Sequence, residues 1–154
     1  MNTLNLKKLV KEIVGRADEL KRKHIENKDA LVNYACIFSQ SKDEYDELLE
    51  AAKKMGTVVK ETPTGLLFQI KPLKTVAGDL KLLKIRIYDP TRPEQGDADF
   101  TISNFAAFEK KYLPKSGFKL IKRPDFVMIE LMDHKFDVRA YFSNPTLEVQ
   151  LNIK

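Results

Sequence analysis

Residues 96–145 read GDADFTISNFAAFEKKYLPKSGFKLIKRPDFVMIELMDHKFDVRAYFSNP, and this stretch decides the fold that the sequence predicts. Apolar and polar residues alternate over 97–103, which indicates a strand. Asn104 can cap a helix that continues to Leu113, and Pro114 stops that helix. Three short strands are expected after it, at 118–122, 126–131 and 136–142.

The same order of elements is predicted for residues 31–90, so the fold is expected to contain a duplicated unit. Residues 31–38 are rich in β-branched and aromatic side chains, which favours a buried strand. Ser41 and Glu44 fit a capping box that starts a helix, and Gly56 is expected to end it in the left-handed conformation. The elements expected next are strands at 57–62 and 66–71, a loop at 72–79, and a strand at 80–88.

The chain is expected to form one domain, 1–154, in which an N-terminal helix precedes the two modules. A chain of 154 residues can bury a core without disulfides or metals. Residues 3–26 carry apolar side chains at three- and four-residue steps, which predicts an amphipathic helix whose last turn, Lys21 to Lys23, is solvated. The two modules and the linker between them are placed at 31–90, 96–145 and 89–96.

The composition, 43% hydrophobic and 32% charged, is that of a folded globular protein. The net charge of +5 comes from 27 basic and 22 acidic residues spread along the chain, so no nucleic-acid surface is expected. No apolar run approaches the roughly 20 residues of a membrane span, and no leader pattern is present, so a cytoplasmic location without membrane contact is expected. Cys36, the single cysteine, lies in an apolar strand pattern and is expected to be a buried, inert thiol.

The order of elements resembles the vicinal oxygen chelate superfamily, which includes glyoxalases, bleomycin-resistance proteins and extradiol dioxygenases. The resemblance is carried by Val32–Phe38 before the first capped helix, Asp97–Ser103 before the second, and Val138–Pro145. It covers most of residues 31–145. The resemblance implies an α+β fold in which two βαβββ modules form a curled, mainly antiparallel or mixed sheet. This sheet would make a cup, here preceded by the N-terminal helix.

The metal sites of that superfamily are not expected in this chain. The family holds its metal with His, Glu or Gln on first strands and with Glu or His on fourth strands. The corresponding positions here are Asn33 and Asp99 on first strands, and Lys84 or Arg86 and Arg139 or Tyr141 on fourth strands. Cationic side chains among the donors would oppose a divalent ion, and neither His24 nor His134 lies on a predicted strand. We therefore expect no metal and no cofactor.

Polar side chains on the predicted strands are candidates for ligand binding on the floor of the cup. An arginine with a lysine nearby suits a carboxylate or phosphate, and acidic side chains can pair the cations or bind donors on the ligand. The alternative is that these residues face water, as on one side of many antiparallel sheets. The candidate residues are Asn33, Gln69, Lys84, Arg86, Asp99, Glu130, Arg139 and Tyr141.

Two functions of different classes follow from this reading. The first is a glyoxalase-like, metal-independent protein or enzyme that binds an anionic metabolite in the cup. The second is a protein–protein interaction module or homodimeric structural domain without a catalytic site, with helix 3–26 as its contact. A triphosphate-tunnel barrel ranks last, because the chain lacks the Glu-x-Glu-x-Lys strand of those enzymes. No nucleophile elbow, phosphate-binding glycine loop or paired metal cysteines are present, so the motifs assign no reaction.

Overall fold

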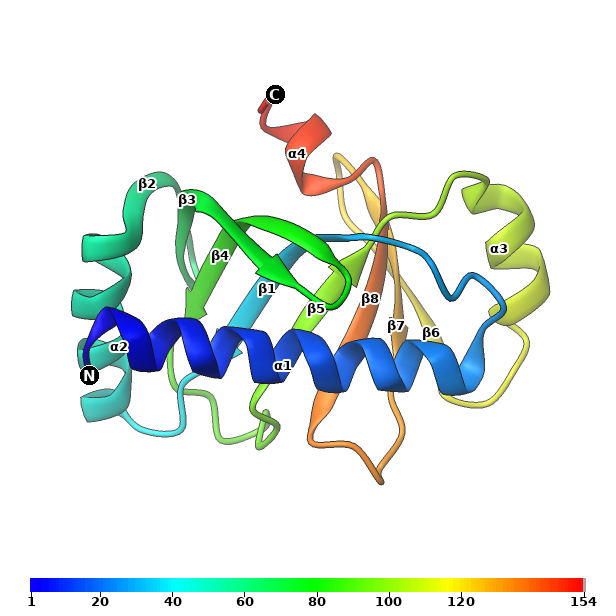
Figure 1. The fold of residues 1–154 in the computed structure, drawn as a ribbon. Helices are drawn as coiled ribbons and strands as arrows, with labels where there is room; N and C mark the ends of the chain where they lie inside the picture. The colour runs from blue at the N-terminus through cyan, green and yellow to red at the C-terminus, as the bar shows by residue number, and fades with distance from the viewer. Residues whose placement is uncertain (154) are drawn as a thin grey trace.

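The computed structural model describes residues 1–153 as an α+β fold, which confirms the predicted fold class. A long N-terminal helix lies across an eight-stranded mixed sheet (Figure 1). The helix and the first module comprise α1 (Thr3–His24), β1 (Val32–Phe38), α2 (Lys42–Met55), β2 (Gly56–Thr62), β3 (Gly65–Thr75) and β4 (Gly78–Arg86). The later elements are β5 (Gly96–Phe100), α3 (Phe105–Tyr112), β6 (Phe118–Lys122), β7 (Val127–Leu131), β8 (Val138–Asn144) and α4 (Leu147–Gln150).

The sheet contains the two expected modules side by side. Its strand order is β2-β3-β4-β1-β5-β8-β7-β6. Within each half, the first strand pairs in parallel with the fourth, β1 with β4 and β5 with β8, while the other neighbours are antiparallel. The two first strands, β1 and β5, pair antiparallel at the centre. The halves are therefore arranged about an approximate two-fold axis between β1 and β5.

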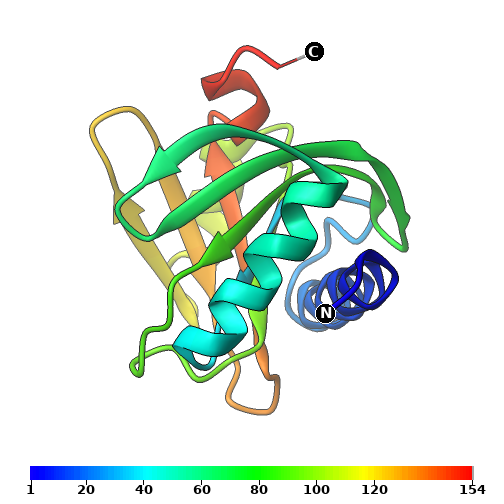
Figure 2. The same cartoon turned by 90° about the vertical axis from the view of Figure 1, so that its left-hand side faces the viewer.

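Helices α1, α2 and α3 pack against the same face of this sheet. Leu83 and Ile85 of β4 are fully buried, as are Ala98 and Phe100 of β5, and all four belong to the core that the helices close. Figure 2 shows the sheet curling, with α1 and α2 near each other on the same side of it. Because side chains alternate between the two faces of a strand, the residues between these apolar positions point to the opposite, concave face.

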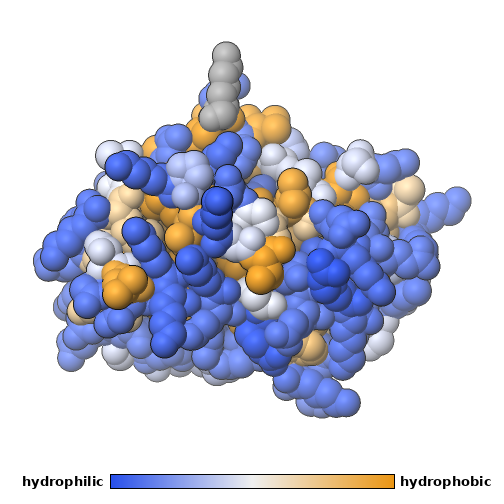
Figure 3. Space-filling view, viewed as in Figure 1, coloured by the Kyte–Doolittle hydropathy of each residue, from blue (hydrophilic) through white to orange (hydrophobic). Residues whose placement is uncertain are grey.

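Helix α1 contributes its whole apolar stripe to this core. The stripe consists of Leu6, Val10, Ile13, Val14, Ala17 and Leu20, each at most 1% exposed. The outer side of the helix is polar, and Figure 3 shows a mainly hydrophilic surface on that side of the molecule. The apolar stripe of α1 is thus used inside the fold. No helix in residues 1–153 is long and apolar enough to cross a membrane.

The solvated last turn predicted for α1 is wrong at Lys21, which is 1% exposed. Its ammonium pairs with Asp18 at 2.7 Å, donates to the carbonyl oxygen of Ala30 at 2.9 Å, and lies 4.7 Å from the ring centroid of Phe100. A buried ammonium is tolerated only when its charge is compensated in this way. Lys21 therefore anchors the end of α1 to the chain that leads into β1.

Two local predictions in the first module are also corrected. Gly56 is extended, with φ of −168°, and starts β2 rather than ending α2 in the left-handed conformation. A Cβ there would lie 2.1 Å from the carbonyl oxygen of Gln69, so the position requires close approach of two backbones. The predicted loop 72–79 is instead the end of β3, a tight turn and the start of β4. Pro72 is accommodated where the register shifts, between Gln69 and Leu73.

We expect Leu20→Ala to lower the free energy of unfolding by about 2–5 kcal/mol, because Leu20 is fully buried under the sheet. Leu4→Ala is the matched control, since Leu4 lies on the same helix but is 73% exposed, and a surface change should stay within about 0.5 kcal/mol. Urea unfolding followed by circular dichroism measures both. Equal effects of the two substitutions would contradict the packing described for α1.

Candidate ligand-binding site

Polar side chains on the concave face line up across the four central strands. The strand pairing places Lys84 beside Cys36, Cys36 beside Asp97, and Asp97 beside Arg139. A second row is formed by Tyr34, Asp99 and Tyr141. The rows arise because most of these residues stand between core positions of their own strand. The concave face is therefore built from the polar half of the alternation.

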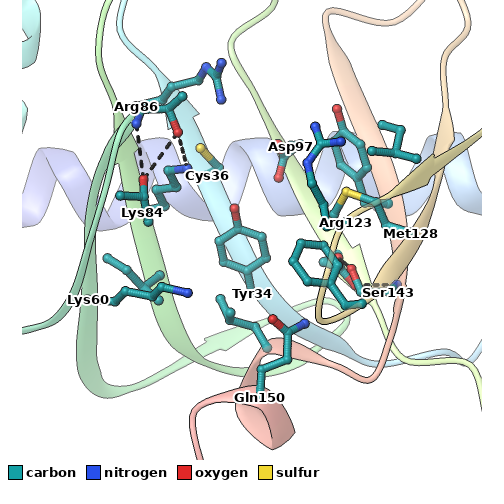
Figure 4. Close-up of a pocket in the computed structure, with 18 of the residues that line it drawn as sticks. Tyr34, Cys36, Lys60, Lys84, Arg86, Asp97, Arg123, Met128, Ser143 and Gln150 are labelled. Atoms are coloured by element: carbon teal, nitrogen blue, oxygen red, sulfur yellow. Dashed lines mark hydrogen bonds between the residues drawn. The ribbon is translucent and has the colours of Figure 1, made fainter.

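These rows form the floor of a cavity of about 480 Å³. Figure 4 shows Lys60, Lys84 and Arg86 on one side of it, Arg123, Met128 and Ser143 on the other, and Tyr34 and Cys36 between them. Leu147 and Gln150 of the C-terminal segment also line the cavity. The remaining lining residues are Thr62, Pro63, Thr64, Leu67, Arg92, Asp97, Asp99, Ile121, Phe126 and Tyr141.

The lining carries more positive than negative charge. Its five cationic side chains are Lys60, Lys84, Arg86, Arg92 and Arg123, against the two carboxyl groups of Asp97 and Asp99. The buried Nε atom of Arg86 has no hydrogen-bond partner in the part of the chain that the structure describes, and its Nη2 lies 3.6 Å from Asp89 Oδ2. A buried guanidinium nitrogen with no acceptor is costly to the protein alone. The site therefore offers an unused donor at its cationic side.

Asp97 is the least satisfied group on the floor. Asp97 is 5% exposed, and its buried Oδ1 atom has no hydrogen-bond partner within residues 1–153. Burial, together with the neighbouring Asp99, raises the pKa of Asp97 to about 8. The cationic groups of Lys84, Arg92 and Arg139 oppose this shift. The carboxyl group is thus mainly protonated near neutral pH, and it can donate as well as accept a hydrogen bond.

Asp99 has a different environment, although it lies only two residues away. Its Oδ1 accepts from the backbone amide of Ser143 at 3.2 Å and from Asn33 Nδ2 at 3.1 Å, and its Oδ2 accepts from the Ser143 hydroxyl. Burial raises the pKa of Asp99 to about 6, and these hydrogen bonds limit the rise. Asp99 is therefore a structural carboxylate that joins β1, β5 and β8.

Lys84 and Cys36 lie next to each other on the floor. Lys84 Nζ donates to Thr64 Oγ1 at 2.6 Å. Burial lowers the pKa of Lys84, whereas burial raises the pKa of the Cys36 thiol far above neutral pH. Cys36 is 2% exposed, and its thiol is uncharged, which is the state of an inert cysteine. The structure places it on the floor of the cavity.

The positive charge of Arg139 is balanced by carboxylates beside the cavity. Its Nε donates to Glu94 Oε1 at 2.6 Å and its Nη1 to Glu130 Oε2 at 3.2 Å. The hydroxyl of Tyr141 donates to the same Glu130 oxygen at 2.6 Å. Hydrogen bonds to Glu94 and Tyr141 raise the pKa of Arg139 against its burial, so its charge is retained. This network supports the second module and leaves Arg139 with little capacity for a ligand.

The structure separates the eight predicted site residues into three groups. Lys84, Arg86, Asp99 and Tyr141 line the cavity. Asn33, Glu130 and Arg139 are buried beside it and hold lining residues in place. Gln69 is exposed on β3, in register with Leu82, and does not line the cavity.

Several lining residues lay outside the prediction. Asp97 could have been found, because it shares the alternating face of Asp99 in the same strand. Three further cations come from an edge strand, the linker and a turn, namely Lys60, Arg92 and Arg123. At these places the sequence has no periodicity that would indicate which way a side chain points. Tyr34 and Cys36 were hidden by a register shift in β1 between Val32 and Tyr34, which changes the residues that face the cup.

The donor set of the cup does not fit a divalent metal ion. No group of three or more His, Cys, Asp or Glu side chains in residues 1–153 is placed to hold one. At the strand positions where the resembling family places its ligands, Lys84 and Arg86 bring positive charge, and the Asp99 carboxylate is already held by Asn33 and Ser143. The positive charges of Lys84 and Arg86 would oppose a divalent cation.

Comparisons with known proteins identify the fold but no activity. No protein-family model and no curated protein match this sequence. A solved structure described as "Structural Genomics, Protein EC4020" matches over 97% of this chain and 91% of its own, with a TM-score of 0.71 and 10% identity. A second, described as "putative dioxygenase from Bacillus subtilis subsp. subtilis str. 168", shares 15% identity over 72% of this chain and 37% of its own, with a TM-score of 0.25. The first match supports the overall fold, and the second is too remote to support an argument.

The raised pKa of Asp97 predicts a stability that falls as pH rises. The folded protein holds this proton up to about pH 8, whereas the unfolded chain releases it near pH 4, so the free energy of unfolding decreases between these values. Asp99 contributes to the decrease only up to about pH 6. Between pH 6 and pH 8, we expect the free energy of unfolding to decrease by about 2 kcal/mol less in Asp97→Asn than in the wild-type protein. Urea unfolding at both pH values measures this difference. An unchanged slope in the variant would contradict the assignment.

Proposed function

We propose that this protein binds a small organic anion in the cup, as a glyoxalase-like protein that works without a metal. The observation that carries the proposal is the excess of cationic side chains around a cavity lined by Arg86 and Asp97, whose Nε and Oδ1 atoms have no hydrogen-bond partner in residues 1–153. A carboxylate or phosphate oxygen accepts from the guanidinium and from a protonated carboxyl group at the same time. Such a ligand would satisfy both groups.

The ligand is expected to carry an apolar body as well as the anionic group. Apolar side chains line the side of the cavity near β6, β7 and α4, namely Ile121, Phe126, Met128 and Leu147. A cavity of about 480 Å³ falls within the range of sites that bind small molecules. The charged and apolar sides together favour an amphiphilic metabolite over an inorganic ion.

Phenylacetate and phenyl phosphate at millimolar concentration should raise the melting temperature of the protein, whereas uncharged benzyl alcohol should not. We expect Arg86→Gln to weaken binding of the anions by about tenfold to a hundredfold in calorimetry, because a charged hydrogen bond is lost. Lys71→Gln is the control, since Lys71 is exposed on β3 and does not line the cavity. Equal shifts by the anions and the alcohol, or equal losses in both variants, would refute the proposal.

Binding of phenyl phosphate should weaken as pH rises through about 8. Above this pH the Asp97 carboxyl loses its proton, and a second negative charge on the floor repels the ligand. The Asp97→Asn variant should show affinity that is independent of pH over the same range. Calorimetric titrations at pH 7 and pH 9 provide the measurement, and a wild-type affinity that stays constant or increases would contradict this role of Asp97.

A further inference from the structure

Lys84 differs from the other buried or ion-paired lysines of this protein. It projects from β4 between the fully buried Leu83 and Ile85, and it lines the cavity. Lys21, Lys23 and Lys111 each pair with a carboxylate, but in residues 1–153 no carboxylate oxygen lies within 4 Å of Lys84 Nζ. The hydrogen bond of Lys84 goes to the uncharged hydroxyl of Thr64. Its ammonium form is therefore poorly compensated.

The surroundings of Lys84 favour its neutral amine. Burial lowers the pKa of Lys84, and the guanidinium groups of Arg86 and Arg92 lower it further. Cys36 and Asp97 would raise it in their charged forms, but burial keeps both mainly protonated near neutral pH. A desolvated lysine next to other cations is the environment in which an amine becomes a nucleophile.

We propose that Lys84 is a nucleophile that forms an imine with the carbonyl group of a small 2-oxo acid bound in the cup. This inference rests on the proposed binding of an organic anion, and it names the substrate class and the covalent step of that site.

The position of Arg86 accounts for the choice of a 2-oxo acid. Arg86 lies two residues from Lys84 on the same face of β4, a separation of about 7 Å along the strand. If the carboxylate of the ligand accepts from the free Nε of Arg86, the neighbouring carbonyl carbon is directed toward Lys84. A carbonyl carbon further from the carboxylate of the ligand would lie beyond the Lys84 amine.

Asp97 is placed to act as the acid of this reaction. Lys84 and Asp97 occupy the same cross-strand row, separated by Cys36 on β1. Two strand spacings separate their backbones by about 10 Å, which leaves room for one ligand carbon and its substituents between the two side chains. Asp97 is mainly protonated in the free protein near neutral pH, and no group in residues 1–153 makes a hydrogen bond with its Oδ1 atom.

The proposed step balances without a cofactor. The lone pair of Lys84 Nζ attacks the carbonyl carbon, a C–N bond forms, and a proton moves from nitrogen to the carbonyl oxygen to give a carbinolamine. Asp97 then donates its proton to the hydroxyl group, the C–O bond breaks, and water leaves. The products are a protonated imine, one water molecule and the Asp97 carboxylate, and hydrolysis by the reverse path restores the free amine.

Reductive trapping tests this inference directly. The protein is incubated at pH 7.5 with pyruvate or phenylpyruvate and sodium cyanoborohydride, which reduces imines, and the product is analysed by intact mass and peptide mapping. We expect one adduct per chain, located on Lys84. Lys84→Arg should abolish this adduct, whereas Lys71→Arg should retain it, because Lys71 is exposed on β3 and does not line the cavity. An absent adduct, or labelling of Lys84 no faster than of the exposed Lys71, overturns the inference.

A second measurement separates failure of this inference from failure of the proposed function. Lys84→Arg cannot form the imine but places a permanent positive charge at the same position, so phenylacetate should still raise the melting temperature of this variant. A shift in the wild-type protein without an adduct on Lys84 overturns the imine and leaves anion binding in place. Absence of both the shift and the adduct overturns both. Asp97→Asn should slow labelling of Lys84, and an unchanged rate would remove Asp97 from the reaction.

Discussion

The alternation of side chains along the four central strands is the constraint on which this structure depends. In β4, β1, β5 and β8, one set of residues enters the core beneath the helices, and the other set forms the polar rows of the cup. A one-residue shift of any of these strands would place charged groups in the core and apolar groups in the cavity. The same physical requirement that closes the core therefore orients the candidate site.

Helices α1, α2 and α3 exclude water from the apolar face of the sheet, so the polar side chains are left to the concave face. The stripe of α1 packs against β5 and β8 of the second module as well as β1 and β3 of the first, so both halves of the sheet share one core. With the curvature maintained by this packing, carboxyl groups such as Asp97 and Asp99 lie deep in the concave face and are desolvated. Their altered proton affinity is a consequence of sheet curvature combined with burial.

The two modules have the same architecture but different electrostatics. On the second module, Arg139, Glu130, Glu94 and Tyr141 satisfy one another in a closed network. On the first, Lys84 and Arg86 have fewer internal partners and face the open cavity. The two modules can differ in this way because each supplies its own fourth strand, β4 or β8, to the cup. The reactive side of the proposed site is accordingly the first module, although Asp97 comes from the second.

The order of elements, the α+β class and the polar faces of β4 and β5 could be predicted from the sequence, because periodicity and capping residues are local signals. The predicted strand at 80–88 already separated Lys84 and Arg86 from the core positions. The sequence alone did not show that Arg139 pairs with the carboxylates of Glu94 and Glu130. It also did not show that Gln69 lies outside the cavity, or that Arg92 and Arg123 line it. Those outcomes depend on register shifts, loop paths and curvature, which arise only when strands distant in the chain pair and bend together.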